Sequence, residues 1–212
     1  MTSKDCGSHH SHSRRRKILR RIVFPIVAFI ALILVVIFLT WAILRPSKPR
    51  FVLLDATVYS FNVSGDPPNL LTSNIQMTLS SRNPNDKIGI YYDRLDVYAA
   101  YQSQQITFPT SIQPTYQGHE EVSVWSPFVG GNSVPIAPYN ALSLEQSSGG
   151  IRLMVHIDGR VRWKVGAFTT GTYHLYVRCP AIISFGDSPR GGVIVGDNAV
   201  KYTLTNGCSV SV

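Results

Sequence analysis

The chain has 212 residues, which is enough for one domain of ordinary size plus accessory segments. Its net charge of +8 is unevenly placed, because residues 1–21 carry seven of the 20 basic residues against one acid, while residues 45–212 carry 13 bases against 11 acids. The excess positive charge belongs to a short tail beside an apolar run. This argues against nucleic-acid binding, which needs a basic folded face, and favours a membrane.

Residues 1–21 are predicted to be a disordered, basic cytosolic tail, because they are polar and rich in small residues. His9, His10 and His12 lack an organised second shell in such a tail, so we expect no metal site there. Acylation of Cys6 has only weak support from its position before the apolar run.

Residues 22–44 are predicted to form a transmembrane helix, because all 23 are uncharged. At ~1.5 Å per residue they span roughly 34 Å, which suits a hydrocarbon core of ~30 Å. A buried helix of a soluble protein and a cleaved signal peptide are the alternatives, and the length of the run and the missing small-residue cleavage site argue against them. More bases precede the run than follow it, so we expect one span with the N-terminus in the cytosol and residues 45–212 outside.

Residues 45–50 contain two prolines and are expected to be a linker to a folded domain at 51–212. Apolar residues then recur with period two, which predicts half-buried strands. The alternating sets are Tyr59, Phe61 and Val63; Ile75, Met77 and Leu79; Ile88, Ile90 and Tyr92; and Leu95, Val97, Ala99 and Tyr101. Because the third set is even-numbered and the fourth is odd-numbered, we predict a β-bulge near Arg94.

Residues 151–165 carry apolar side chains on both sides of Asp158 and Gly159. We interpret them as a hairpin in which Gly159 takes the left-handed position of a three-residue loop and Val155 faces Val161. The opposite face carries His156 and a basic contact face, which consists of Arg152, Arg160, Arg162 and Lys164. We expect it to be solvated; the alternative is contact with anionic lipid or an acidic wall polysaccharide.

Taken together, the patterns predict a mainly β fold. We expect a two-sheet antiparallel β-sandwich of fibronectin III or immunoglobulin type, with one short helix starting near Pro138 and one transmembrane helix before the domain. Cys179 and Cys208 are able to pair outside the cytosol, although the sequence does not establish that they are close. Asn62 begins a glycosylation sequon on the polar parity of its strand.

No motif predicts an enzyme. The Gly-Asp-Ser sequence at 186–188 matches the nucleophile block of one lipase family, but the Asp-x-x-His that this family needs near the C-terminus is missing. Of the three histidines outside the tail, His119, His156 and His174, the last two alternate with apolar residues of predicted strands and are interpreted as exposed strand residues rather than ligands. No nucleophile elbow, Walker A loop, dinucleotide fingerprint, HExxH, CxxC pair or EF-hand spacing occurs. We therefore expect no catalytic, cofactor-binding or metal residues.

The stretch "SRNPNDKIGIYYD" at 81–93 is interpreted as a connection between two strands. Pro84 keeps Asn83 out of the helical region, and Asn83 and Asn85 are expected to brace the turn through hydrogen bonds to the nearby backbone. Tyr92 is expected to pack inward.

Three stretches together resemble one family. "RNPNDKIGIYYDRLDVYAAYQSQQI" (82–106), "GRVRWKVG" (159–166) and "YHLYVRCP" (173–180) are similar to the signatures of the plant harpin-induced / non-race-specific disease resistance family. The order of tail, anchor and domain also matches, and the resemblance covers nearly the whole chain. The signature residues are Asn83, Pro84, Asn85, Tyr92, Asp93, Gly159, Trp163, Lys164, Val165 and Gly166.

The resemblance implies a late embryogenesis abundant group-two domain, which is a β-sandwich without known catalytic residues or cofactors. It also implies a plasma-membrane protein with an apoplastic domain, a link to the hypersensitive response and plant defence, and glycosylation, which would fall on Asn62. Two hypotheses follow. One is an immune component that acts through protein partners; the other is a domain for membrane–wall adhesion or protection against desiccation stress.

Overall fold

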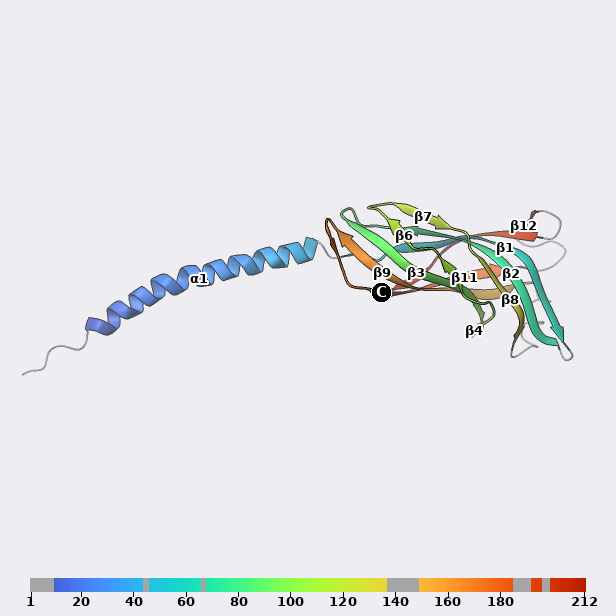
Figure 1. The fold of residues 1–212 in the computed structure, drawn as a ribbon, viewed down its shortest axis with the longest axis horizontal. Coiled ribbons are helices and arrows are strands. Elements are labelled where there is room, and N and C mark those ends of the chain that lie inside the picture. The colour runs from blue at the N-terminus through green and yellow to red at the C-terminus, as the bar shows by residue number, and fades with distance from the viewer. Residues whose placement is uncertain (1–9, 44–45, 66–67, 137–148, 185–191, 196–198) are drawn as a thin grey trace, which may run out of the picture. The chain divides into compact units, whose positions relative to one another are not determined.

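The computed structural model describes residues 10–43, 46–65, 68–136, 149–184, 192–195 and 199–212. The chain divides into two units, Met1–Arg45 and Pro46–Val212 (Figure 1). The helix predicted near Pro138 and the Gly-Asp-Ser sequence at 186–188 lie outside the described residues.

The described residues of the first unit form one helix, α1 (His10–Ile43). Its segment Arg21–Phe38 has a mean hydropathy of 2.9, and the helix is long and apolar enough to cross a membrane. The helix begins at His10, which differs from the expectation that residues 1–21 are disordered. Once the apolar segment is helical, each added residue gains a hydrogen bond without a new nucleation step, and arginine and lysine are good helix formers.

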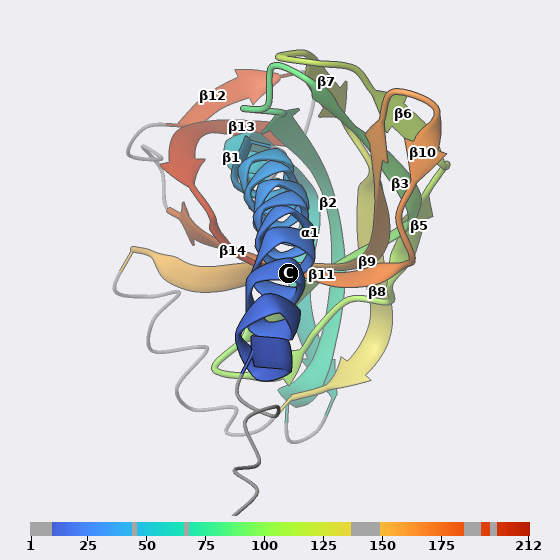
Figure 2. The ribbon, with the colours of Figure 1, turned by 90° about the vertical axis from the view of Figure 1, so that its left-hand side faces the viewer.

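The second unit is built from two antiparallel sheets (Figure 2). The six-stranded sheet has the order β12 (Gly192–Val195), β13 (Ala199–Gly207), β1 (Arg50–Gly65), β2 (Pro68–Arg82) and β7 (Val122–Trp125), with β8 (Phe128–Pro135) also on β2. The eight-stranded sheet has the order β14 (Ser209–Ser211), β11 (Tyr173–Ile183), β9 (Ile151–Val165), β3 (Ile88–Tyr101) and β4 (Gln104–Gln105), with β10 (Phe168–Thr169) on β9 and β5 (Thr110–Ile112) and β6 (Thr115–Gln117) on β3. The predicted two-sheet fold is confirmed.

Alternate residues of the strands form one hydrophobic core. Ile75 and Leu79 of β2 are fully buried, as the period-two pattern predicts. Tyr59 is an exception, because the pairing of β1 with β2 slips between Val58 and Ser60. The slip leaves Tyr59 42% exposed, and its hydroxyl donates to the side chain of Gln76.

The predicted bulge near Arg94 is confirmed. Tyr92 pairs with Val161 and Arg94 pairs with Arg160, so Asp93 is the extra residue of β3. The bulge returns the apolar residues of β3 to the core on both sides, because Tyr92 and Leu95 are each 1% exposed.

The predicted hairpin at Asp158–Gly159 is wrong. β9 continues as a single strand from Ile151 to Val165, and Gly159 lies in it opposite Leu95 of β3. A Cβ on Gly159 would lie 2.6 Å from the carbonyl oxygen of Arg94 and 2.6 Å from Cδ2 of Leu95. The glycine therefore accommodates the bulged backbone of β3, and it marks a close approach of two strands rather than a turn.

The chain changes sheets between β13 and β14, at Cys208. Its sulfur is bonded to that of Cys179 on β11, and the two Cα atoms are 4.3 Å apart. The disulfide therefore fastens the crossing point to the eight-stranded sheet.

Candidate functional site

The loop after β2 is organised by the side chain of Asn83, which is fully buried. Its Nδ2 donates to the carbonyl oxygens of Ile88 at 2.7 Å and Gly118 at 2.8 Å. Its Oδ1 accepts from the backbone N–H and from Nδ2 of Asn85, at 3.1 and 2.8 Å. One amide thus joins the ends of three segments, and it does so with all of its strong donor and acceptor groups engaged.

Asn85 in turn holds the segment that leads into β1. Its Oδ1 accepts from the N–H of Ser47 at 2.8 Å, and its Nδ2 donates to the carbonyl oxygen of Ser47 at 2.9 Å. The Asn85 carbonyl also accepts from the N–H of Glu120 at 3.1 Å. The side-chain amide therefore pairs with Ser47 as a peptide group of a neighbouring strand would. We call Asn83, Asn85 and Ser47 the asparagine clamp.

Tyr92 packs inward beneath the clamp, as its position in the third alternating set suggests. Its hydroxyl contacts Ser81 Oγ and Gln117 Oε1, both at 2.9 Å. Burial raises the pKa of Tyr92 above its ordinary value. Its ring meets those of Phe51 and Trp125 edge to face, with centroids 6.2 and 5.5 Å apart. This part of the family signature thus serves the core and its hydrogen bonds.

The face of β3, β9 and β11 that points away from the core carries most of the polar aromatic and charged side chains of the eight-stranded sheet. We call it the outer face; it consists of Tyr91, Asp93, Arg94, Asp96, Tyr98, Arg152, Met154, His156, Asp158, Arg160, Arg162, Lys164, His174, Tyr176 and Arg178. The predicted basic contact face lies within it. The outer face is more mixed in charge than these four basic residues suggest, because β3 contributes two acids and β9 itself contributes Asp158.

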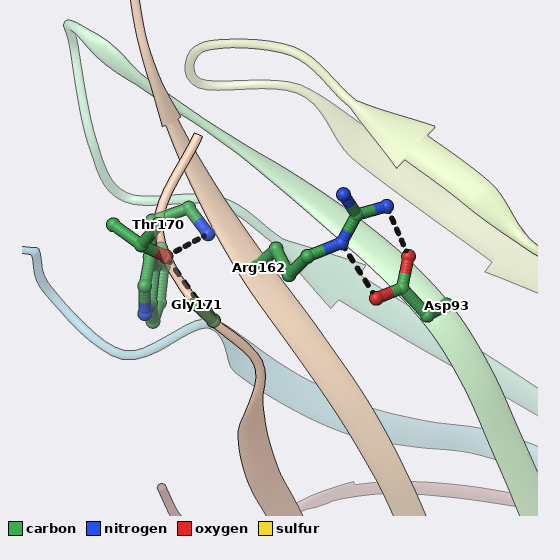
Figure 3. A network of polar contacts seen from close by, with 5 residues as sticks. Asp93, Arg162, Thr170 and Gly171 are labelled. Atoms are coloured by element: carbon green, nitrogen blue, oxygen red, sulfur yellow. Dashed lines mark hydrogen bonds and ion pairs between the residues drawn. The ribbon is translucent and has the colours of Figure 1, made fainter. Parts of the chain in front are cut away.

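The bulged residue of β3 makes a two-point contact with β9. Arg162 donates from Nε and Nη2 to the two carboxylate oxygens of Asp93, each at 2.7 Å (Figure 3). These hydrogen bonds hold the pKa of Asp93 below its ordinary value. The pair therefore stabilises the fold above the unfolded pKa of an aspartate, and this contribution is lost as the pH falls through the lowered folded value.

Other groups of the outer face are arranged in stacked and charged rows. The rings of Tyr91 and Tyr116 lie 4.5 Å apart, and Lys164 Nζ lies 5.8 and 5.2 Å from their centroids. Tyr98 stacks on His156 with centroids 5.1 Å apart, and burial lowers the pKa of His156. A cation over two rings and a near-parallel aromatic pair are arrangements that also occur in binding surfaces.

Two shallow hollows lie along the outer face. The larger, of about 790 Å³, is lined in part by Tyr98, Arg152, His156 and Arg178. The smaller, of about 360 Å³, is lined by Arg94, Asp96, Asp158, Gly159, Arg160, His174 and Tyr176. Arg152, Arg160 and Arg178 form no ion pair with another described residue, so these guanidinium groups are free to meet an external anion.

The remaining signature residues fix the end of β9. Gly166 has φ of +57° and opens the two-residue turn between Val165 and Phe168. Trp163 is buried, and its backbone N–H donates to Thr170 Oγ1 at 3.0 Å. The hydroxyl of Thr170 in turn donates to the carbonyl of Gly171 at 3.0 Å (Figure 3). These residues brace a hairpin and take part in no reactive arrangement.

The described residues contain no group of three His, Cys, Asp or Glu side chains that could hold a metal ion. Asn62 lies exposed on β1, and His119 is exposed in the loop before β7. Sequence reasoning missed Ser47, Gln117 and Tyr116 as partners of the signature residues. These three residues contact Asn85, Tyr92 and Tyr91, respectively, only in the folded chain, and a single sequence does not reveal such contacts.

The comparisons with known proteins agree with the signatures. The family model described as "Late embryogenesis abundant protein" matches residues 78–179. NDR1/HIN1-like protein 1 of Arabidopsis thaliana is 67% identical over 211 residues, which cover 99% of this chain and 100% of that protein. NDR1/HIN1-like protein 12 of the same plant is 59% identical over 214 residues, with complete coverage of both chains. A putative late embryogenesis abundant protein solved in solution has 13% identity and a TM-score of 0.32, and the match covers 84% of this chain and 94% of that one. The chain belongs to the NDR1/HIN1-like family of plant proteins, and residues 78–179 of its second unit match the late embryogenesis abundant model.

Proposed function

We propose that the protein is a single-pass plasma-membrane component of plant immunity, which acts through contacts of its extracellular β-sandwich with other proteins rather than by catalysis. Membership of the NDR1/HIN1-like family supports a role in plant stress and defence. Beyond that role, we propose the location in the plasma membrane, the extracellular side for the β-sandwich, and action through protein contacts.

Three observations support the membrane and the orientation. Among the described residues, one helix is long and apolar enough to span a bilayer, and the turns before its apolar segment are strongly basic. Cys179 and Cys208 form a disulfide, which persists outside the cytosol and is rare within it. Asn62 is exposed, as a glycosylated asparagine must be.

The observation that carries the mode of action is the outer face. Stacked aromatic rings and unpaired arginines add little to the stability of a sheet face that only meets water. Arg160 and Arg178 nevertheless flank hollows of this face without an ion pair among the described residues. Unpaired guanidinium groups beside aromatic rings are typical of protein interfaces, where arginine and tyrosine are enriched.

The experiment is proximity labelling from the second unit in plant cells, before and after pathogen challenge. Arg160→Ala with Arg178→Ala is compared with Lys201→Ala, which removes a half-buried cation from the other sheet and breaks its ion pair with Asp55. We expect challenge-dependent neighbours that disappear in the arginine variant and persist in the Lys201 variant. An identical set of neighbours in all three proteins would contradict the assignment to the outer face.

The second candidate is adhesion between membrane and wall, or protection in desiccation. The favouring observation is the same cationic face, because it is also suited to an acidic polysaccharide. Loss of membrane–wall contact in plasmolysed cells that lack the protein, without any change of protein neighbours on challenge, would favour this candidate over the first.

A further inference from the structure

The end of the sandwich where the chain enters carries an apolar side chain that the fold does not use. We call this the entry end; it consists of Pro46–Arg50, Arg82–Lys87, Gly118–Val122 and Lys164–Phe168. Arg50 pairs with Arg82, Asn85 binds Ser47 and Glu120, and Ile88 pairs with Val165, so these segments lie together.

Phe168 is 82% exposed, the highest value among the large apolar side chains described in the second unit. It follows the turn that Gly166 opens, in the hairpin of β9 and β10 (Figure 2). The hairpin is held on both sides, because Thr170 N–H donates to the Trp163 carbonyl at 2.9 Å and Thr170 Oγ1 accepts from the Trp163 N–H. A braced turn thus holds a phenylalanine in solvent, where its ring is available to gain free energy by burial against a partner.

Chain length limits how far the entry end can lie from the membrane that α1 would span. The helix ends at Ile43, and Ser47 is already bound by Asn85. Four residues reach at most ~14 Å when fully extended. The bound follows from the covalent chain alone and holds for any orientation of the helix.

Charge at the entry end suits an anionic surface. Five cations belong to it, Lys48, Arg50, Arg82, Lys87 and Lys164, against the acids Asp86, Glu120 and Glu121. Glu121 is also engaged, since its Oε2 accepts from the N–H of Gly118. Basic residues near an anionic leaflet are attracted to it, and aromatic rings favour the headgroup layer.

We propose that the entry end is a second membrane contact, in which Phe168 enters the headgroup layer of an anionic bilayer and the surrounding cations face its phosphates. This rests on the proposed membrane anchoring. It assigns the hairpin of β9 and β10 to lipid, and leaves the outer face, apart from Lys164 at its margin, free for protein partners.

The test uses the full chain with Cys6→Ser and Ala167→Cys, reconstituted into vesicles of phosphatidylcholine with or without phosphatidylserine. A membrane-impermeant, polarity-sensitive dye then labels position 167 of the outward-facing molecules, and nitroxides on the lipid chains serve as quenchers. We expect blue-shifted emission and quenching, stronger with phosphatidylserine. Phe168→Ser should weaken docking by about tenfold, as expected when burial of a large apolar side chain is lost. Phe108→Ser is the matched control, because Phe108 is 61% exposed but lies away from the entry end. Its backbone N–H donates to the carbonyl of Gly130, and Gly130 pairs with Asn74, which is eight residues along β2 from Arg82.

The outcomes separate this inference from the proposal that it rests on. If the chain fails to float with alkali-washed vesicles, anchoring itself is wrong. If it floats but the dye remains in water, or if Phe168→Ser changes the signal no more than Phe108→Ser does, the second contact is refuted and anchoring stands. A blue shift of the dye emission without quenching by the lipid nitroxides would assign the hairpin to a protein contact and would likewise refute the second membrane contact.

Discussion

Replacing Asn83 by aspartate tests the asparagine clamp without changing its shape. The Asn83→Asp side chain keeps the acceptor that serves Asn85. It loses the two donors that serve the carbonyl oxygens of Ile88 and Gly118 at 2.7 and 2.8 Å. An aspartate also places a carboxylate where the native side chain is fully buried.

The magnitude follows from the two orphaned carbonyls. A buried polar group that loses its partner costs about 1–3 kcal/mol, so the two together cost about 2–6 kcal/mol of the free energy of unfolding. For a folded unit of this size, 1 kcal/mol corresponds to roughly 2–4 °C in Tm. We therefore expect the Tm of the variant to fall by about 5–20 °C at neutral pH.

The loss should depend on pH in a defined direction. Burial raises the folded pKa of the introduced aspartate above its unfolded value of about 3.9, and the protonated form can donate one hydrogen bond. The penalty is therefore smallest below the unfolded pKa and grows as the pH rises through the folded one. The Tm difference from the unaltered chain should shrink between pH 7 and pH 4.

The assay is thermal unfolding of the full chain in detergent, followed by tryptophan fluorescence at both pH values. Asn74→Asp is the matched control, because Asn74 is exposed on β2, the strand that precedes Asn83. If Asn83→Asp melted within about 2 °C of the control at pH 7, corresponding to less than about 1 kcal/mol, the clamp would not stabilise the fold and the reasoning above would be refuted.

Three further changes test other features. Gly159→Ala should lower the Tm, because overpacking against β3 costs about 1–3 kcal/mol. Gly171→Ala should leave the Tm unchanged, because nothing lies within 4 Å of its added Cβ. Equal changes of Tm in the two variants would contradict the close approach of β9 and β3. Asn85→Ala should speed amide hydrogen exchange in the linker before β1 while leaving exchange in β9 unchanged, and unaltered exchange in the linker would show that the clamp does not hold it. Reducing the bond between Cys179 and Cys208 should add the mass of two hydrogen atoms and lower stability by about 3–4 kcal/mol, measured in denaturant with and without reductant.

The alternation of apolar residues made the strands and the bulge predictable. Tyr92 and Leu95 differ in parity by one, and since period two follows from backbone geometry alone, one extra residue had to lie between them. The bulge at Asp93 is where that residue lies.

The role of Gly159 could not be predicted in the same way. A glycine after an aspartate is a turn signal, and it is equally what a strand needs where another backbone comes close. The choice depends on Arg94 and Leu95, which lie far away in the sequence and reach Gly159 only through the pairing of β3 with β9.

The clamp was predicted in part. The bracing role of Asn83 and Asn85 follows from asparagines that flank a proline, since short amides bond readily to nearby backbone. Their attachment to Ser47 and Gly118 depends on tertiary structure, because those residues arrive from separate segments. The start of α1 at His10 was missed because composition describes an isolated tail, whereas the helix extends from a stable neighbour.

The disulfide also helps to keep the edge of the eight-stranded sheet covered. β14 is the strand that covers the open side of β11 among the described residues, and it does so with three pairs, from Tyr176 to Arg178. Because Cys208 directly precedes β14 and is tied to Cys179, these few hydrogen bonds can open without the terminus drifting away. An uncovered border strand offers its N–H and C=O groups to other molecules. Reduction should therefore promote edge-to-edge aggregation, so the bond preserves solubility as well as stability.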